Sequence, residues 1–258
     1  AALTSALDQR PAMLIVETIS NPTLRVPDVA SLSDMCHQRD VTLLVDNTVA
    51  SPIVCRPLEH GADLVMESLT KIMNGHSDVL LGLLCGRDNT WDRIPEVITT
   101  WGFAAAPLDC WLASRGLGTL ALRAARASEN ALAIAQHLSS DKRVAHVLYP
   151  GLSDHPDHAA AAKQFAGMYG SMVTFSLPGG RPAAERFVAA ATEIPLSPSL
   201  GDLSTTLSHP ATTSHRGMTP QGRAELGIDD GMLRLSVGIE SAAGILASLE
   251  TALAATNA

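Results

Sequence analysis

The sequence predicts an α/β protein in which a mostly parallel sheet is sandwiched by helices, followed by a smaller α+β domain. Two observations indicate this fold class. Short apolar runs alternate with helical patterns through the first half of the chain, and a long helical segment separates this half from a tail of mixed strands and helices. At 258 residues, the chain is long enough to bury a sizeable core in one large domain or in two unequal ones.

The apolar runs of the first half are the predicted strands. They cover residues 13–17, 42–46, 63–68 and 79–86. Alternation of such runs with helices is typical of parallel strands in a doubly wound sheet. After the first run, apolar residues recur at helical spacing behind Asp28, which lies in the first turn, where the helix dipole favours an anion. We therefore predict an amphipathic crossover helix over residues 28–39.

The second half begins with a long helical pattern from Pro107 that contains Gly116 and Gly118, where we expect a bend. We place the domain junction in this pattern, so that residues 1–125 form the larger domain and residues 126–258 the smaller one. The smaller domain is predicted to contain strands over 144–150, 170–177 and 232–239, a helix over 182–192, and helices that start at Thr219-Pro220 and at Ser241.

The composition of the chain indicates which kinds of molecule are disfavoured as partners of the protein. The net charge is −8, aromatic residues make up 3% of the chain and no block of Lys or Arg occurs, so nucleic acid binding is disfavoured. No segment has the length of a bilayer-spanning helix and the start lacks a signal-peptide pattern, so we expect a cytoplasmic protein with no membrane partner. Reduced structural thiols are expected at the four widely spaced cysteines, Cys36, Cys55, Cys85 and Cys110.

One of the three lysines lies where a catalytic residue is expected. Lys71 follows the apolar run at 63–68 and so lies at the carboxyl end of a predicted strand, where open α/β sheets bind ligands. Burial at such a place lowers the pKa of an amine and makes it a nucleophile or a base. Lys71 is therefore the candidate catalytic residue, whereas Lys142 and Lys163 lie in polar surface patterns.

Further polar residues follow the neighbouring strands. The run at 42–46 ends on Asp46, and Ser68 and Thr70 flank Lys71. Pyridoxal 5'-phosphate (PLP) needs this set of groups: a lysine for the Schiff base, a carboxylate for the pyridine nitrogen, and hydroxyls for the phosphate. Each residue alone is more typical of a strand or helix cap. Their joint placement favours a PLP site.

Four segments of the sequence resemble, in this order, the motifs of the Cys/Met metabolism PLP-dependent family: ETISNPTLRVPD, LLVDNTVASP, ESLTKIMNGHSDV and MLRLSVGIES. This family includes cystathionine γ-synthase, cystathionine γ-lyase and methionine γ-lyase. The likeness extends through WLASRGLGTLALR, VLYPGL, SLGD and SHPATTSH and covers nearly the whole chain. It implies the fold of the type I PLP-dependent transferases, similar to aspartate aminotransferase, with residues 1–125 as the C-terminal portion of the PLP-binding large domain.

The resemblance also implies roles for single residues at the cofactor. Lys71 matches the lysine that forms the Schiff base, and Asp46 matches the partner of the pyridinium nitrogen. Ser68 and Thr70 match residues that contact the phosphate. Asn21, in the SNP turn, matches a residue close to the 3'-oxygen of the cofactor and to the substrate carboxylate. The implied cofactor is PLP.

On the substrate side, the resemblance implies that Arg234, in LRLSVG, binds the α-carboxylate, a task that suits a planar guanidinium, and that Ser199, in SLGD, assists it. The implied substrate is a small amino acid, and the implied assembly is a homotetramer built as a dimer of dimers. Four positions depart from the family pattern, among them Gly118, which replaces a common lysine. Asn74 replaces the usual first glycine of GGHSD, Ile72 replaces an aromatic residue, and Pro198 stands where members with different reactions differ.

The family's upstream segment has no counterpart in this sequence. That segment supplies a glycine-containing phosphate loop, a tyrosine that stacks on the pyridine ring, and a tyrosine and an arginine that reach into the neighbouring subunit's site. Two explanations remain open at this point. Either the full protein is longer than the sequence, or the chain is a fragment that has lost activity.

The resulting prediction is a transsulfuration-type enzyme that catalyses γ-elimination or γ-replacement on cystathionine, methionine or an O-acylhomoserine through Lys71. One alternative is a non-catalytic or truncated protein with the PLP fold. Another is a serine hydrolase that uses Ser68-x-x-Lys71, although the accompanying S-D-N and K-T-G motifs are absent. His155 and His158 are candidate metal ligands, but their spacing suits a surface loop, and we predict no metal site.

Overall fold

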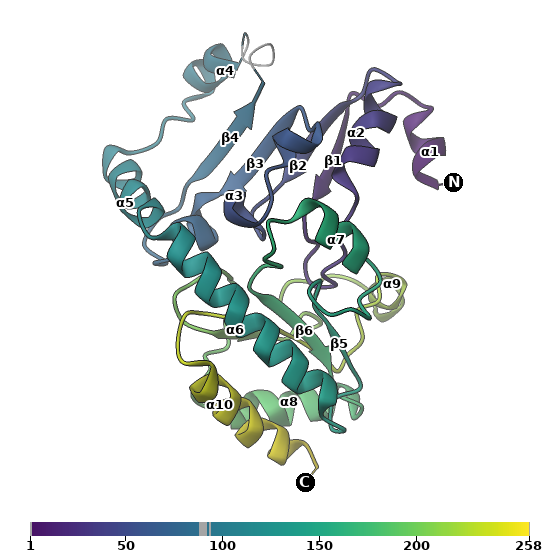
Figure 1. Cartoon of the computed structure of the whole chain (residues 1–258), viewed down its shortest axis with the longest axis vertical. Coiled ribbons are helices and arrows are strands. Elements are labelled where there is room, and N and C mark those ends of the chain that lie inside the picture. The colour runs from purple at the N-terminus through teal and green to yellow at the C-terminus, as the bar shows by residue number, and fades with distance from the viewer. Residues whose placement is uncertain (1, 88–91, 93, 258) are drawn as a thin grey trace.

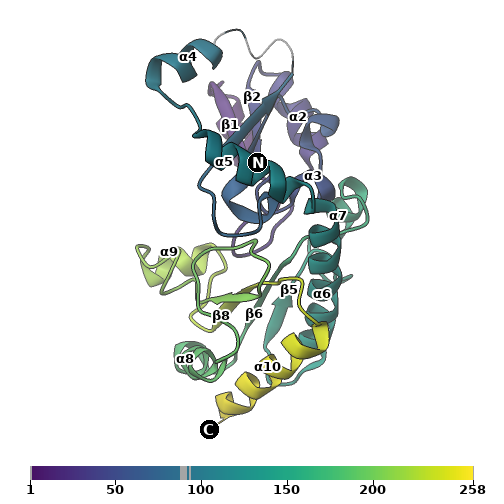
Figure 2. The same ribbon diagram turned by 90° about the vertical axis from the view of Figure 1, so that its left-hand side faces the viewer.

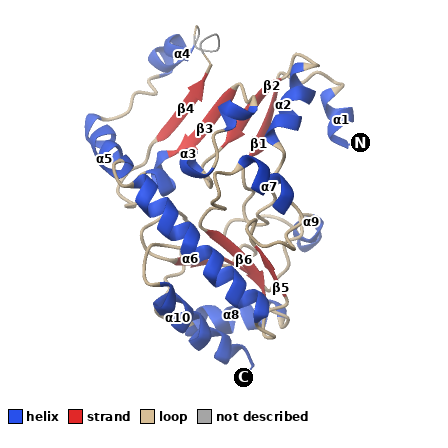
Figure 3. Ribbon diagram, viewed as in Figure 1, coloured by secondary structure: helices blue, strands red, loops and turns tan. Residues whose placement is uncertain are grey.

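The structure of the protein is a computed structural model that describes residues 2–87, 92 and 94–257. Two sheets are visible, one in the upper and one in the lower part of the molecule (Figures 1 and 3). The long helix α6 (Leu120–Ser140) runs beside the lower sheet. The chain starts beside the upper sheet and ends below the lower one (Figure 1). Each sheet therefore belongs to a different half of the sequence.

The upper sheet is built from the four apolar runs that were predicted as strands. They are β1 (Met13–Glu17), β2 (Thr42–Asp46), β3 (Leu64–Ser68) and β4 (Gly82–Gly86), in the order β1-β2-β3-β4. The first three are parallel, which confirms the prediction. The prediction of a parallel strand at 79–86 is wrong in direction, because β4 pairs with β3 antiparallel. A π-helical turn, η2 (Leu69–Met73), follows β3 in place of a crossover helix, and the chain returns alongside β3.

Helices cover one face of the upper sheet. They are α1 (Ala2–Leu7) and α2 (Val29–His37). Their apolar side chains share a buried core with those of β2 and β3. The predicted crossover helix is confirmed, and Asp28 caps it by accepting a hydrogen bond from the Ser31 backbone N–H at 3.0 Å. On the opposite face Ile15 and Met66 are 64% and 39% exposed, so this face is open within the described part of the chain.

Between the strands and after them lie several short elements. They are α3 (Ser51–Val54), the 3₁₀ helix η1 (Pro57–His60), α4 (Ile94–Trp101) and α5 (Pro107–Leu117). The predicted bend in the long helical pattern is confirmed, because α5 ends just before Gly118 and α6 begins at Leu120. The predicted domain junction at residues 125 and 126 lies inside α6, and its position stays a prediction.

The lower sheet is antiparallel, with the strand order β5-β6-β8-β7. Its strands are β5 (His146–Leu148), β6 (Met172–Ser176), β7 (Thr206–Ser208) and β8 (Met232–Ser236). The helices of this half are α6, α7 (His158–Gln164), α8 (Gly180–Ala190), α9 (Pro220–Glu225), α10 (Ala242–Ala254) and the 3₁₀ helix η4 (Ala255–Asn257). Figure 2 shows α6 and α9 on opposite sides of the sheet. Alternate side chains of its strands therefore meet different surroundings.

This alternation directs apolar and polar side chains to different faces of the lower sheet. Leu233 and Leu235 of β8 lie in the apolar core formed with α6, α8 and α10. Arg234, between them, points to the other face, which lies toward the upper sheet's loops: the neighbouring Thr174 of β6 donates a hydrogen bond to the Pro22 carbonyl at 2.6 Å. None of the helices that the structure describes combines the length and the apolar character needed to cross a membrane.

Candidate active site

The carboxyl ends of the parallel strands meet at one edge of the upper sheet. Glu17 of β1 pairs with Asp46 of β2, and β3 ends on Ser68 beside them. A pocket of about 340 Å³ opens at this edge, and its lining includes Asp46, Thr48, Ser68 and Thr70. The structure thus brings together the carboxylate and the two hydroxyls that the sequence nominated for the cofactor.

Hydrogen bonds fix the polar groups of this pocket. Asp46 Oδ1 accepts from the Thr48 backbone N–H at 3.0 Å, and Thr48 Oγ1 accepts from the Ser68 backbone N–H at 2.9 Å. The Thr70 hydroxyl lies 3.3 Å from the carbonyl oxygen and 3.0 Å from the backbone nitrogen of Leu81. Thr48 was not among the predicted site residues, although its place directly behind Asp46 could have indicated it.

Lys71 lies in the turn η2, directly after β3. Its Nζ donates a hydrogen bond to Ser199 Oγ at 3.0 Å. Burial lowers the pKa of the Lys71 ammonium, and the positive charge of Arg234 lowers it further. An amine with a lowered pKa is more often free to act as a nucleophile or base at neutral pH. The predicted catalytic lysine therefore faces a residue from the second half of the chain.

Arg234 completes this cluster from β8. Its Nη1 donates to Asn21 Oδ1 at 2.9 Å and its Nη2 to the Ser199 carbonyl at 2.7 Å, while Nε has no hydrogen-bond partner within the described residues. The side chain is buried, and burial lowers its pKa to about 10, so it remains a cation at neutral pH. A buried cation with an unused N–H group suits an anionic ligand such as a carboxylate.

The turn that carries Lys71 is held from two sides. Arg123 of α6 donates to the carbonyls of Ile72, Met73 and Gly116 at 2.6, 2.9 and 2.8 Å. On the other side, a Cβ at Gly201 would lie 2.4 Å from the Ile72 backbone nitrogen, and φ at Gly201 is +78°, so only glycine fits there. The sequence prediction missed Arg123, since a buried arginine that binds backbone carbonyls has no local signal.

The residues at this edge fit PLP. Asp46 offers an acceptor for a protonated ring nitrogen, Ser68 lies in the same pocket with a hydroxyl for a phosphate, and Lys71 offers an amine of lowered pKa. The unpartnered Nε of Arg234 offers a donor to the carboxylate of an amino acid. In the described part of the chain the pocket lining includes no aromatic side chain that would stack on the ring.

Two alternative chemistries find less support in the geometry. Ser68 is both the last residue of β3 and the N-cap of the turn η2, and Lys71 Nζ donates its hydrogen bond to Ser199 rather than to Ser68. The prediction of a surface loop is wrong for His155, whose side chain is buried. Its Nδ1 lies 3.1 Å from the Asp157 backbone nitrogen, and His158 Nδ1 lies 2.9 Å from the Pro150 carbonyl oxygen.

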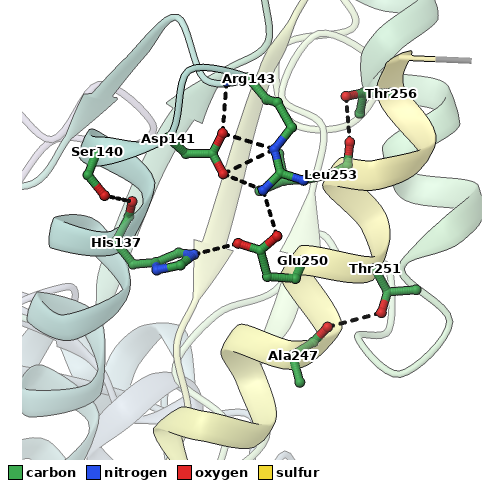
Figure 4. A network of polar contacts seen from close by, with 9 residues as sticks. All are labelled: His137, Ser140, Asp141, Arg143, Ala247, Glu250, Thr251, Leu253 and Thr256. Atoms are coloured by element: carbon green, nitrogen blue, oxygen red, sulfur yellow. Dashed lines mark hydrogen bonds and ion pairs between the residues drawn. The ribbon is translucent and has the colours of Figure 1, made fainter.

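A different cluster has the composition of a metal site. His137, Asp141 and Glu250 have ligand atoms within 4.8 Å of one another (Figure 4). Among the described residues, this is the one group of three side chains close enough to hold a metal ion together. Both carboxylates, however, already have a cationic partner. Arg143 binds Asp141 and also Glu250, the latter at 2.6 Å, while His137 Nε2 lies 2.7 Å from Glu250 Oε1. These ion pairs thus connect the C-terminal end of α6 to α10.

A carboxylate and two hydroxyls at the carboxyl edge of a mostly parallel sheet, with an amine of lowered pKa next to a buried arginine, are the groups that a PLP-dependent enzyme of the type I fold needs. The chain belongs to the Cys/Met metabolism PLP-dependent enzyme family, whose sequence profile matches residues 1–254. This confirms the resemblance found in the motifs. The profile reaches into both halves of the chain, so both the upper and the lower sheet belong to the family's structure.

Relatives with different reactions resemble the chain to a similar degree. It is 38% identical over 252 residues to cystathionine gamma-lyase of Dictyostelium discoideum and 36% identical over 255 residues to O-succinylhomoserine sulfhydrylase of Pseudomonas aeruginosa. These alignments cover 97% and 99% of this chain, which spans 65% and 63% of the relatives' length. A crystal structure of cystathionine gamma synthase from Xanthomonas oryzae pv. oryzae, in complex with aminoacrylate and cysteine, matches with a TM-score of 0.95 at 41% identity, over 99% of this chain and 66% of that one.

Proposed function

We propose that the protein catalyses γ-elimination or γ-replacement on a sulfur-type amino acid, namely cystathionine, methionine or an O-acylhomoserine, with PLP held by Lys71. One observation carries the proposal. Lys71 Nζ, on the upper sheet's edge, lies 3.0 Å from Ser199 Oγ, and Arg234 donates to the carbonyl of the same serine. An amine and a buried guanidinium from two halves of the chain thus contact the same serine.

The residues of the cluster have complementary roles in this proposal. Arg234 binds the substrate α-carboxylate, aided by Asn21 and Ser199, and so orients the α-carbon toward Lys71. PLP, when bound, supplies the electron sink that stabilises negative charge at that carbon. Asp46 would accept the hydrogen bond of the ring nitrogen and keep it protonated, and Ser68 and Thr70 would bind the phosphate. Lys71 would hold the cofactor and would accept the proton of the α-carbon.

The choice between elimination and replacement depends on whether a thiol adds at the γ-carbon after the γ-substituent has left. Addition of a thiol there gives a new thioether, whereas hydrolysis at the carbon that carries the nitrogen releases a 2-oxo acid and ammonia. The relatives that resemble this chain include a lyase, a sulfhydrylase and a synthase. We therefore propose a reaction at the γ-carbon, and the assay below distinguishes elimination from replacement.

Amino-acid turnover by PLP-loaded protein tests the proposal. Cystathionine, methionine and O-acylhomoserines are offered separately, with and without a thiol, and 2-oxobutanoate and the thioether product are measured. We expect Lys71→Ala to lower turnover by roughly three orders of magnitude or more and to leave PLP without a covalent bond that borohydride can make permanent. Lys163→Ala is the matched control, because this surface lysine contacts Asp28 at 3.1 Å, away from the cluster.

A wild-type protein that binds no PLP would refute the proposal and favour the non-catalytic alternative. Bound PLP with equal turnover in the Lys71 and Lys163 variants would instead refute the role of Lys71. Either outcome is read from absorbance of the bound cofactor and from product formation. The two measurements therefore separate the loss of the site from the loss of its chemistry.

We further propose a homotetramer in the cytoplasm, as the family resemblance implies. Large apolar side chains on and beside α4 and α5 support burial of this region against another chain. Trp101, Phe103 and Trp111 are 73%, 67% and 57% exposed. Sedimentation equilibrium of the PLP-loaded protein measures the assembly, and a monomeric mass would contradict the proposal.

A further inference from the structure

Behind the pocket, the side chain of Asn47 is fully buried and bonded on three sides. Its Oδ1 accepts from Thr18 Oγ1 at 2.7 Å, and its Nδ2 donates to the Cys55 carbonyl at 3.0 Å and to Glu67 Oε1 at 2.7 Å. A carbonyl oxygen only accepts, so the bond to Cys55 determines which end of the amide carries the N–H groups. Asn47 thus ties the ends of β1, β2 and β3 to the residue that follows α3.

Glu67 is the member of this network that can change its charge. The residue is 3% exposed, lines a cavity of about 230 Å³, and its Oε2 has no hydrogen-bond partner within the described residues. Burial raises the pKa of Glu67 to about 8, the hydrogen bond from Asn47 lowers it, and the charge of Asp46 raises it. At neutral pH Glu67 is therefore mostly uncharged, with Oε1 as the acceptor for Asn47 and the proton on Oε2.

The other titratable groups around Glu67 lie on or next to α3, η1, β4 and β2. Cys55 follows α3, and its pKa is raised to about 12, chiefly by burial. Burial also raises the pKa of Cys85 on β4, so both thiols are neutral at pH 7. Arg56 and Glu59 of the same cavity pair with each other at 3.2 Å, and the charge of Asp46 on β2 raises the pKa of Glu67. Ionisation of Glu67 would place a buried negative charge next to the half-buried carboxylate of the pocket.

We propose that Glu67 is a positioning residue for Asp46: its carboxyl group anchors Asn47 and so keeps Asp46 directed into the pocket. Glu67 follows Met66 and precedes Ser68 on β3, and it lines both the pocket of Asp46 and Ser68 and the cavity that Asn47 lines. An uncharged acid serves this purpose without repelling Asp46. The consequence for PLP rests on the proposed function, whereas the placement of Asp46 does not.

Hydrogen exchange and cofactor binding test the proposal in the full chain. The Thr48 backbone N–H, which donates to Asp46 Oδ1, reports on the position of Asp46 without any cofactor. In Glu67→Leu we expect this amide to exchange about fivefold faster at pH 7, the ratio that the loss of one buried hydrogen bond produces. The PLP dissociation constant should rise by a similar factor of about five, with a changed absorbance spectrum of the bound cofactor.

Conservative variants separate positioning from mere support of the fold. Glu67→Gln keeps an acceptor for Asn47 and should restore both readouts to within about twofold of the wild type. Thr18→Val removes a different bond to Asn47, keeps the shape of the side chain, and should move both readouts in the same direction as Glu67→Leu. Glu59→Gln is the control, because this acid lines the same cavity but pairs with Arg56 at 3.2 Å.

Each outcome has one meaning. Unchanged exchange at Thr48 in folded Glu67→Leu, or in Thr18→Val if the first variant does not fold, would overturn the proposal. Failure of Glu67→Gln to restore the wild-type values would also overturn it, because the anchoring bond is then not what matters. If Thr48 exchange responds as expected but the wild type binds no PLP, the proposed function fails while the positioning of Asp46 stands.

Discussion

Replacement of Glu67 by glutamine is expected to make the protein more stable at alkaline pH. Glutamine has nearly the same shape and no charge at any pH, so the variant removes the titration and keeps the acceptor for Asn47. In the wild type, burial raises the pKa of Glu67 from an ordinary 4.5 to about 8. A carboxyl group with a raised pKa favours the folded state below pH 4.5, and this contribution is lost as the pH rises toward 8.

The magnitude follows from the two pKa values. Between them the folded protein keeps a proton that the unfolded chain has released, so the free energy of unfolding falls with pH. At 1.36 kcal/mol for each pH unit, the loss in the wild type between pH 5 and pH 9 amounts to about 4 kcal/mol. The variant lacks this loss. The difference in the free energy of unfolding between variant and wild type should therefore grow by the same amount.

Urea unfolding followed by circular dichroism at pH 5, 7 and 9 measures this difference. All other titrating groups are common to both proteins and cancel in the subtraction. Glu59→Gln is the matched control, since the Glu59 side chain is 65% exposed and its replacement should leave the pH dependence unchanged. Parallel stability curves for Glu67→Gln and the wild type would refute a buried, uncharged Glu67.

Three further substitutions test the surroundings of Lys71. Arg234→Lys should raise the KM of the amino-acid substrate about tenfold in steady-state kinetics, because an ammonium cannot bind a carboxylate through two parallel N–H groups. Gly201→Ala should lower the free energy of unfolding by roughly 2 kcal/mol in urea, since φ is +78° and the new Cβ would meet Ile72 at 2.4 Å. Arg123→Met removes three hydrogen bonds to carbonyls and should cost about 3 kcal/mol by the same method. An unchanged value in any of these measurements contradicts the corresponding contact.

Local signals were sufficient for most strands and helices. Each strand of the upper sheet coincides with an apolar run, and the helices predicted to begin near Asp28, Thr219 and Ser241 are present. Each of these three residues caps its helix by accepting a hydrogen bond from a backbone N–H three residues later. These features depend on residues next to one another in the chain. The direction of β4 does not, because an apolar run has the same pattern in either direction, and only the turn after β3 decides it.

The candidate site depended on contacts that no local pattern contains. Lys71 and Ser199 are 128 positions apart, and Arg234 and Asn21 are 213 apart. From the residues alone Arg234 would have been interpreted as an ordinary surface or salt-bridged arginine, and only the resemblance to the family assigned it to the site. The structure now brings these four residues together. Their roles toward PLP and substrate stay predictions until the variants are measured.

The same two-residue period that predicts strands also explains why each polar side chain lies where it does. In β8, Leu233 and Leu235 must lie in the apolar core, and Arg234 between them is thereby directed toward Asn21 and Ser199. A shift of the strand by one residue would bury the cation among α6, α8 and α10 and expose both leucines. The free energy of the core therefore enforces the position of the arginine, although the core residues contact no ligand.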